Sequence, residues 1–226
     1  MSVTLLEART QVRDLLDEPV AQFWSDDQLN GWINEAAKDI ARKLEWKRAS
    51  ASIAVAATTQ TVTAPADVYR IYRIQYTEDG GGTDTYTVEF RGYMEMDQIW
   101  GINQEWPGSY PLYYTLWKVP PTMDIILYPV PSAAGHLTVF YYQQIIEAVA
   151  DGDDIDVLEG WEDVSYDYAV YRALRKDADP RWQEFKATYE DKIVDMMTST
   201  RTFQDQAGTF TTGQAALPSW LVSDGY

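Results

Sequence analysis

The sequence predicts an α+β fold: a discontinuous four-helix bundle with a large antiparallel β-rich insertion and an extended C-terminal tail. Three observations predict it. Apolar residues recur at helical spacing near both ends of the chain, the period changes to two between them, and both periodicity and charge fade beyond residue 200. The expected parts are a helical core at 1–47 and 148–200, a β-rich insertion at 48–147 and a tail at 201–226.

Two helices are expected near the N-terminus, at 4–17 and 25–46. Thr4 with Glu7, and Ser25 with Gln28, have the spacing of capping boxes, in which each pair satisfies backbone amides at a helix start. The second helix carries an apolar stripe bounded by small residues, so another helix can approach it closely. It is therefore expected to lie in the core.

The middle of the chain alternates like strands. A strand pair bent at 57–58 is expected from 53–55 and 59–63, followed by strands at 68–76, 86–90, 112–119, 124–128 and 137–143. A short helix is expected at 93–100. The loop Glu78, Asp79, Gly80, Gly81 and Gly82 is expected to be a loose, exposed tip.

Helical spacing returns at 160–176 and 180–198, where Asp179 is a suitable N-cap and Pro180 suits the first helical position. The helical-core residues expected on all four helices are Leu29, Trp32, Ile33, Ile40, Trp161, Tyr168, Trp182, Phe185 and Tyr189. The two helical pairs are expected to pack together across the β-rich insertion.

The C-terminal segment is small, polar and glycine-containing, which is typical of a segment that does not fold alone. Apolar residues are nevertheless spaced along it like anchors: Phe203, Phe210, Leu217, Pro218, Trp220, Leu221 and Tyr226.

The formal net charge of −17, from 35 acidic and 18 basic residues, argues against sequence-independent DNA binding through a broad basic surface. The absence of cysteine excludes disulfides and thiolate metal sites. The charged, amphipathic N-terminus is not expected to be a signal peptide, and no apolar run approaches bilayer length.

No pattern of catalytic or metal-binding residues stands out. His136 is the only histidine and has no spaced partners, so a structural role is expected. The run from Asp151 through Asp153 and Asp154 fails the spacing of a calcium loop and is expected to be a solvated link that favours the N-terminus of the following helix. The triple glycine precedes no helix and is not a phosphate-binding loop. We expect no catalytic residue, metal or cofactor.

Several short motifs together resemble the head-to-tail connector, or adaptor, proteins of tailed bacteriophages. They are Trp24-Ser25-Asp26, Trp32-Ile33-Asn34-Glu35-Ala36, Ala64-Pro65-Ala66-Asp67, the segment IILYPVP at 125–131, Trp161-Glu162-Asp163 and Ala178-Asp179-Pro180-Arg181-Trp182. The resemblance covers most of the chain as far as residue 197. The β-rich insertion is longer than the minimal members of that family need.

The resemblance implies a structural, non-enzymatic protein of the virion, assembled in the host cytoplasm and located at the head–tail neck. Its subunits would form a ring, typically twelvefold, beneath the portal, extend the channel for double-stranded DNA without sequence-specific binding, and give a platform to tail, nozzle or terminator proteins. The C-terminal segment of the chain, 201–226, would then be a docking arm for the portal. The acidic loop at 78–82 would line the lumen of the ring or make contacts with neighbouring proteins. No membrane is implied.

Two other classes remain open. Aromatic residues of the β-rich insertion, including Trp100, Trp106, Tyr110, Tyr113, Tyr114 and Trp117, suit a carbohydrate- or receptor-binding protein associated with the phage tail. A hydrolase would need two carboxylates meeting in a cleft, which sequence spacing cannot reveal.

Overall fold

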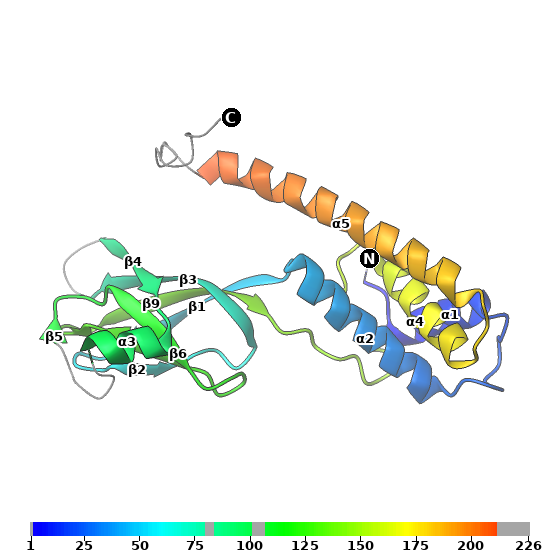
Figure 1. Cartoon of the computed structure of the whole chain (residues 1–226), viewed down its shortest axis with the longest axis horizontal. Coiled ribbons are helices and arrows are strands. Elements are labelled where there is room, and N and C mark those ends of the chain that lie inside the picture. Colours follow the sequence, from blue (N-terminus) through cyan, green and yellow to red (C-terminus); the bar gives the residue numbers. More distant parts are fainter. Residues whose placement is uncertain (1, 80–83, 101–106, 212–226) are drawn as a thin grey trace. The chain divides into compact units, whose positions relative to one another are not determined.

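The computed structural model of the chain describes residues 2–79, 84–100 and 107–211, which divide into two compact units (Figure 1). The helical unit is built from both ends of the chain, up to Leu44 and from Glu147 onward. The sheet unit is the interval Glu45–Ile146. The fold class is α+β, as predicted.

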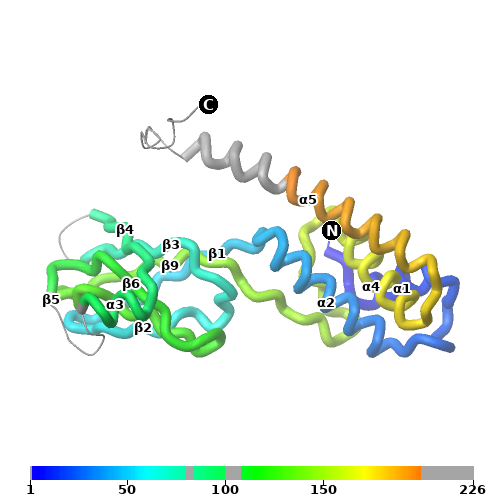
Figure 2. Tube along the Cα trace, in the orientation of Figure 1, coloured from blue at the N-terminus to red at the C-terminus, as the bar shows by residue number. Residues whose placement is uncertain are grey.

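Four helices form the helical unit: α1 (Leu5–Leu15), α2 (Asp26–Leu44), α4 (Glu162–Lys176) and α5 (Trp182–Thr211). Helix α4 contacts each of the other three, and Figure 2 shows it beside α1 and α5 although the sheet unit separates α4 from α1 in the sequence. The helical unit is thus completed only by the C-terminal part of the chain. Its description as a regular four-helix bundle stays a prediction.

Both expected capping boxes are confirmed. The Thr4 amide donates to Glu7 Oε2 at 2.9 Å, and the Glu7 amide donates back to Thr4 Oγ1 at 3.3 Å. Ser25 and Gln28 exchange the equivalent bonds, both at 3.3 Å. These bonds satisfy amides that a helix start otherwise leaves without partners.

Apolar side chains from all four helices meet in two clusters of buried residues. The first contains Leu5, Ala8, Val12, Leu29, Ile33, Ala169, Val170 and Ala173, and the second contains Ala36, Ile40, Val164, Tyr168, Tyr189, Ile193 and Met196. Each fully buried leucine or isoleucine contributes about 1.5–3 kcal/mol by leaving water. Since each cluster combines residues of α2 with residues of α4, the two ends of the chain share one core.

Helix α5 is longer than predicted. It continues to Thr211, beyond the expected end at 198, so the expectation of an extended conformation from residue 201 is wrong for 201–211. Adding a residue to an existing helix costs far less than starting one, so a weakly periodic segment can continue a helix that tertiary packing has already formed.

Nine strands build the sheet unit: β1 (Arg48–Val55), β2 (Thr61–Thr63), β3 (Val68–Glu78), β4 (Thr85–Phe90), β5 (Pro107–Gly108), β6 (Tyr113–Trp117), β7 (Asp124–Tyr128), β8 (Val130–Pro131) and β9 (Gly135–Gln143). Seven of them form one sheet in the order β1-β9-β3-β4-β6-β7-β2. Neighbours are antiparallel except β4 and β6, and β5 pairs with β8 in a separate parallel pair.

The sequence predicted that β1 and β2 would pair with each other, and this prediction is wrong. β1 pairs with β9, and β2 pairs with β7. The bend between them is held elsewhere, because the Thr58 amide donates to the carbonyl of Pro131 at 2.8 Å. Alternation in the sequence identifies a strand but carries no information about its partner.

One face of the seven-stranded sheet encloses the main core of this unit, which includes Val55, Val62, Val68, Ile74, Val88, Ile125, Leu127, Leu137 and Val139. The short helix α3 (Tyr93–Trp100), present at the predicted residues, packs on β6 and β7 through the fully buried Met96. Since the core occupies one face of β1, β9 and β3, their other face is left free for polar and aromatic residues.

Candidate functional site

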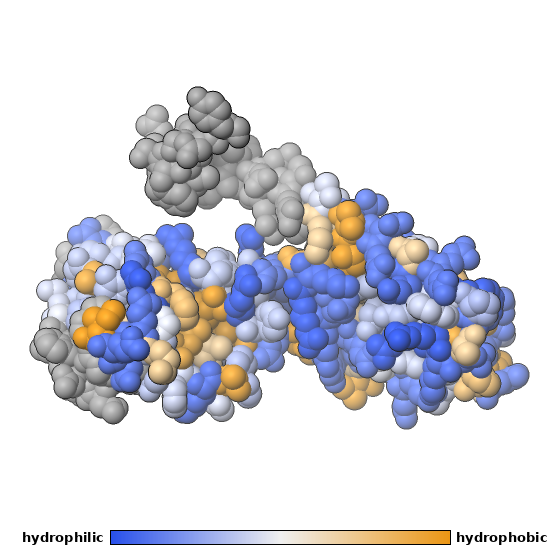
Figure 3. All heavy atoms as spheres, viewed as in Figure 1, coloured by the Kyte–Doolittle hydropathy of each residue, from blue (hydrophilic) through white to orange (hydrophobic). Residues whose placement is uncertain are grey.

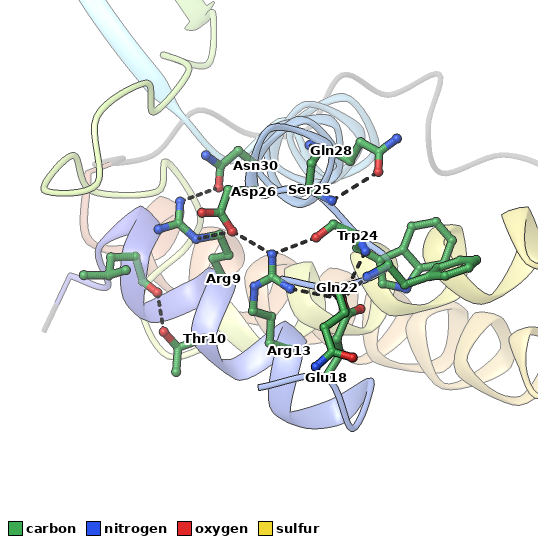
Figure 4. Close-up of polar contacts among 12 residues, drawn as sticks. Arg9, Thr10, Arg13, Glu18, Gln22, Trp24, Ser25, Asp26, Gln28 and Asn30 are labelled. Atoms are coloured by element: carbon green, nitrogen blue, oxygen red, sulfur yellow. Dashed lines mark hydrogen bonds and ion pairs between the residues drawn. The ribbon is translucent and has the colours of Figure 1, made fainter. Parts of the chain in front are cut away.

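Two arginines of α1 are buried and connect separate parts of the helical unit (Figure 4). Arg9 and Arg13 are 7% and 6% exposed. Arg13 Nη2 donates to the carbonyl of Trp24 at 2.9 Å and to Asp26 Oδ1 at 2.6 Å, and Arg9 Nη1 donates to Asp151 Oδ1 at 2.9 Å. A desolvated guanidinium needs such partners, so these contacts are structural.

Glu18 organises the link between α1 and α2. One of its carboxylate oxygens accepts from the backbone amides of Gln22 (2.6 Å), Phe23 (2.5 Å) and Trp24 (3.1 Å) (Figure 4). Burial alone raises the pKa of Glu18, but the three amides and the nearby Arg13 guanidinium together hold that pKa below its usual value. The ionised carboxylate therefore stabilises this link.

The acidic link after the sheet unit supports α1 rather than the helix that follows it. The amides of Leu5 and Leu6 donate to the carbonyls of Asp153 (2.8 Å) and Asp151 (3.1 Å). Asp153 Oδ2 accepts from the amides of Val149 and Ala150, and these bonds lower the pKa of the Asp153 carboxyl. Within the described residues, no group of three or more histidine, aspartate or glutamate side chains is placed to hold a metal ion.

Polar contacts also attach α5 to its neighbours. Lys192 Nζ lies 2.5 Å from Asp163 and 2.6 Å from the buried carboxylate of Asp167 on α4. The Tyr189 hydroxyl donates to Asp39 on α2 at 2.5 Å, and burial together with this bond raises the pKa of Tyr189. These contacts orient the base of α5 within the helical unit.

Exposed apolar side chains lie on α3 and on segments beside it and beside its neighbour β6. We call the following residues the α3 patch: Phe90, Met94, Ile99, Leu112, Trp117 and Val119. Met94 is 68% exposed, and Trp117 is 47% exposed and stacks on Tyr93 with ring centroids 4.5 Å apart. Figure 3 shows hydrophobic side chains among polar ones on the face of the sheet unit that is in view. Large apolar side chains that are exposed on neighbouring segments are typical of a surface that binds another protein.

The aromatic residues predicted as one platform are distributed over different environments. Tyr114 is buried in the core, Tyr110 stacks on Tyr86 with centroids 3.8 Å apart, and Tyr113 lies under Arg91. Trp117 alone of these four belongs to the α3 patch. Trp106 and the side chain of Trp100 lie outside the described residues.

The predicted loop is described only in part. Glu78 and Asp79 are exposed at the end of β3, and Asp79 lies 3.1 Å from Nε2 of the exposed His136. Gly80, Gly81 and Gly82 lie outside the described residues. His136 thus makes an exposed contact with Asp79.

The predicted helical-core residues lie in the two helical clusters. Leu29, Ile33, Ile40, Tyr168 and Tyr189 are buried, and Trp32, Trp161, Trp182 and Phe185 are partly buried against them. Of the predicted tail anchors, Phe203 and Phe210 fall in the last turns of α5, without described side chains. The others, Leu217, Pro218, Trp220, Leu221 and Tyr226, lie outside the described residues.

Negative charge is concentrated in the helical unit. Residues 45–146 contain ten acidic and six basic residues, so they carry four of the 17 net negative charges and the rest of the chain carries thirteen. None of the helices in the described part of the chain combines the length and apolar character needed to cross a bilayer.

Comparison with known proteins gives a family match that spans both units. A model of the family described as SU10 adaptor protein matches residues 3–215. Among solved structures, a chain from the neck of an empty GTA particle is similar at 14% identity and a TM-score of 0.26, covering 77% of this chain and 84% of that chain. No curated protein matches the chain.

Proposed function

Because the chain belongs to the SU10 adaptor protein family, we propose that it forms the ring that joins a bacteriophage head to its tail. The family match is the observation that carries this proposal, since it spans the helices of both chain ends and the sheet unit. It agrees with the resemblance to head-to-tail adaptor proteins found in the short motifs. The role is structural, and no catalytic residue is proposed.

In the proposed assembly, copies of the chain form a closed ring of twelve, the number that the resemblance implies, seated beneath the portal in the virion. Each subunit consists of the discontinuous four-helix bundle (1–47 and 148–200) and the β-rich insertion (48–147). Tail, nozzle or terminator proteins then attach on the far side of the ring. Assembly takes place in the host cytoplasm.

The α3 patch supports a platform function. A monomeric protein rarely leaves so many large apolar side chains exposed together, and a stable binding surface usually has an aromatic anchor at its centre. Trp117, stacked on Tyr93, is such an anchor. We assign the α3 patch to the tail-side partner.

The negative charge supports a channel role. Double-stranded DNA passing a net negative wall meets repulsion rather than the strong, salt-dependent binding that lysines would cause. We assign the wall to acidic side chains of the helical unit or to Glu78 and Asp79. A net basic wall in an image of the ring would contradict this assignment.

The C-terminal segment 201–226 is proposed to bind the portal. Phe203 and Phe210 would contact it from the end of α5, and the cluster at 217–221, with Trp220 as its main anchor, would fill a pocket. Removing a tryptophan anchor from such an interface typically costs about 2 kcal/mol or more per copy. Repeated around a ring, that loss prevents stable attachment.

The proposal is tested with tail-less, portal-bearing heads and three variants. One chain ends after Thr211, which keeps α5 and removes the segment beyond it. The second carries Trp220→Ala, and the matched control carries Ser219→Ala in the same segment. Electron microscopy counts the heads that bear a ring.

We expect wild type and Ser219→Ala to occupy the portal vertex and both other variants to fail. If all four proteins attach equally well, the C-terminal segment is not the portal-binding arm. If wild type itself forms no ring, alone or on heads, the adaptor proposal is wrong.

A further inference from the structure

The strand β3 contains a three-residue repeat, Val-Tyr-Arg-Ile-Tyr-Arg-Ile at 68–74, that a regular strand cannot accommodate on one face. Val68, Ile71 and Ile74 are all buried, whereas both Tyr-Arg pairs between them are exposed. Two register shifts against β9, between Val68 and Arg70 and between Ile71 and Arg73, make this arrangement. Strand side chains otherwise alternate with a period of two.

The two bulges weaken backbone pairing and change the direction of side chains. Each interrupts the ladder of backbone hydrogen bonds, and a bulge turns particular side chains to the other face of the sheet. Their effect is to keep an aliphatic residue in the core at every third position while two polar or aromatic residues face outward. Two successive bulges in one strand therefore present four such side chains to a partner.

The outward side chains join others from β1 and β9. We call Arg48, Arg70, Tyr72, Arg73, Phe140 and Tyr142 the Arg–Tyr face. The guanidinium of Arg48 lies 5.7 Å and 5.8 Å from the ring centroids of Tyr72 and Tyr142. Arg73 lies 5.6 Å from the centroid of Phe140. Aromatic rings thus hold these arginines in fixed positions before any partner binds.

Two of the three arginines carry charge that the described residues do not neutralise. Arg70 pairs with Glu45 at 2.7 Å. Arg48 and Arg73 form no ion pair with any residue that the structure describes. In a chain with nearly twice as many acidic as basic residues, two such arginines together on one face indicate an acidic partner.

The chain itself offers an acidic surface on α5. Glu184, Asp191 and Asp195 are exposed and form no ion pair among the described residues. Residues seven and four positions apart share one side of a helix, and the 60% exposed Val194 adjoins them. We call these four residues the α5 stripe.

The spacing of opposite charges agrees. Glu184 and Asp191 are about 10 Å apart along the helix axis. Arg48 and Arg73 lie on β1 and β3, which β9 separates, and the β9 residues opposite them are two positions apart, so the two arginines are about 12 Å apart. An aromatic residue, Tyr72, lies between the arginines and suits the apolar Val194.

We propose that the Arg–Tyr face of one copy of this chain binds the α5 stripe of the next copy. The inference rests on the ring of the proposed function and names its subunit contact. Two different surfaces of the same chain meet, so the contact is heterologous and repeats from copy to copy until a ring closes. Nucleic acid is the less suitable partner, because the net charge of −17 repels phosphate.

Charge reversal on each surface gives a direct experiment with the full chain. Variant one carries Arg48→Glu and Arg73→Glu, and variant two carries Glu184→Arg and Asp191→Arg. The matched control is Arg42→Glu on α2, an exposed arginine that forms no ion pair or aromatic contact among the described residues. Circular dichroism checks folding, and sedimentation velocity measures the mass of the assembled species.

Wild type and Arg42→Glu are expected to associate at low salt and to weaken as the Debye length falls from about 10 Å to about 3 Å. Each reversed variant alone is expected to lose association by at least about tenfold in Kd, because like charges then meet. An equimolar mixture of the two variants restores it, since each face then meets a stripe of opposite charge. Only an alternating assembly with an even number of subunits satisfies every contact.

Three results overturn the inference. The first is a wild-type protein that stays monomeric at low salt. The second is an assembly that both charge reversals leave unchanged. Failure of the mixture to restore assembly shows that the two surfaces do not meet between copies. If variant one instead loses binding to double-stranded DNA in a mobility-shift assay while assembly persists, the face binds nucleic acid. If rings persist in the reversed variants, the proposed adaptor function remains supported and only this subunit contact is wrong.

Discussion

Glu18 accepts bonds from three consecutive backbone amides, so its carboxylate must be ionised for the link between α1 and α2 to keep its shape. Glu18→Gln is expected to reduce the free energy of unfolding at pH 7 by about 1–2 kcal/mol, because the bonds lose their charge assistance. Urea unfolding followed by circular dichroism measures the change.

The same variant has a defined pH dependence. Because the folded-state pKa of Glu18 is lowered, its contribution is complete above the unfolded-state value of about 4.3 and is lost as pH falls through the folded-state pKa. The difference between wild type and Glu18→Gln should therefore shrink toward acid pH. A difference that stays constant across that range would show that ionisation is irrelevant.

Gly135 begins β9 where no side chain fits. A Cβ there would lie 2.5 Å from the carbonyl oxygen of Thr77 and 2.6 Å from the ring of Tyr76. Gly135→Ala is expected to destabilise the protein by about 1–3 kcal/mol through overpacking. Gly92→Ala, where a Cβ meets nothing within 4 Å, is the control and should stay within about 0.5 kcal/mol of wild type in thermal unfolding.

At the scale of elements, α2 is the clearest example of what the sequence could and could not reveal. Its capping box and apolar stripe are local features, and both were predictable from spacing. The side-chain amide of Asn34 exchanges two bonds with the backbone of Ala148, at 2.9 Å and 3.0 Å, and no spacing in the sequence predicts them. A contact between residues more than a hundred positions apart produces no periodic pattern in the sequence.

The strands show the same limit. Most predicted strands and helix α3 were found close to their predicted positions, because alternation and turn residues are local. The partner of each strand was not predictable, and β2 was assigned the wrong one. The repeat at 68–74 did carry a signal: a period of three in a strand indicates bulges, and it could have identified the Arg–Tyr face.

The Asn34 contact predicts an effect on stability. Asn34→Ala leaves both backbone groups of Ala148 without their partner, and this should cost about 1–3 kcal/mol. Glu35→Ala, which removes only an exposed pair with Arg172, is the control and should cost less than about 1 kcal/mol. Equal losses in denaturant unfolding would mean that the Asn34 bonds add nothing specific.

At the scale of the whole molecule, the charge of −17 sets the behaviour in solution. Repulsion between copies fades near the isoelectric point, which the composition places at about 4.3. Light scattering across pH should show a minimum of solubility there and recovery on both sides. Equal solubility at pH 4.3 and pH 7 would show that net charge is not what keeps the chain in solution.

The discontinuous helical unit also has a consequence for synthesis. When the ribosome has made α2, α1 is present, but the α4 and α5 residues that complete the cover of Leu29, Ile33 and Ile40 do not yet exist, because the whole sheet unit must be translated before α4. At about 5–20 residues per second, this delay is on the order of ten seconds. A nascent chain that stops early can build a sheet but not the helical unit, so only chains translated through α5 present both surfaces of the proposed subunit contact.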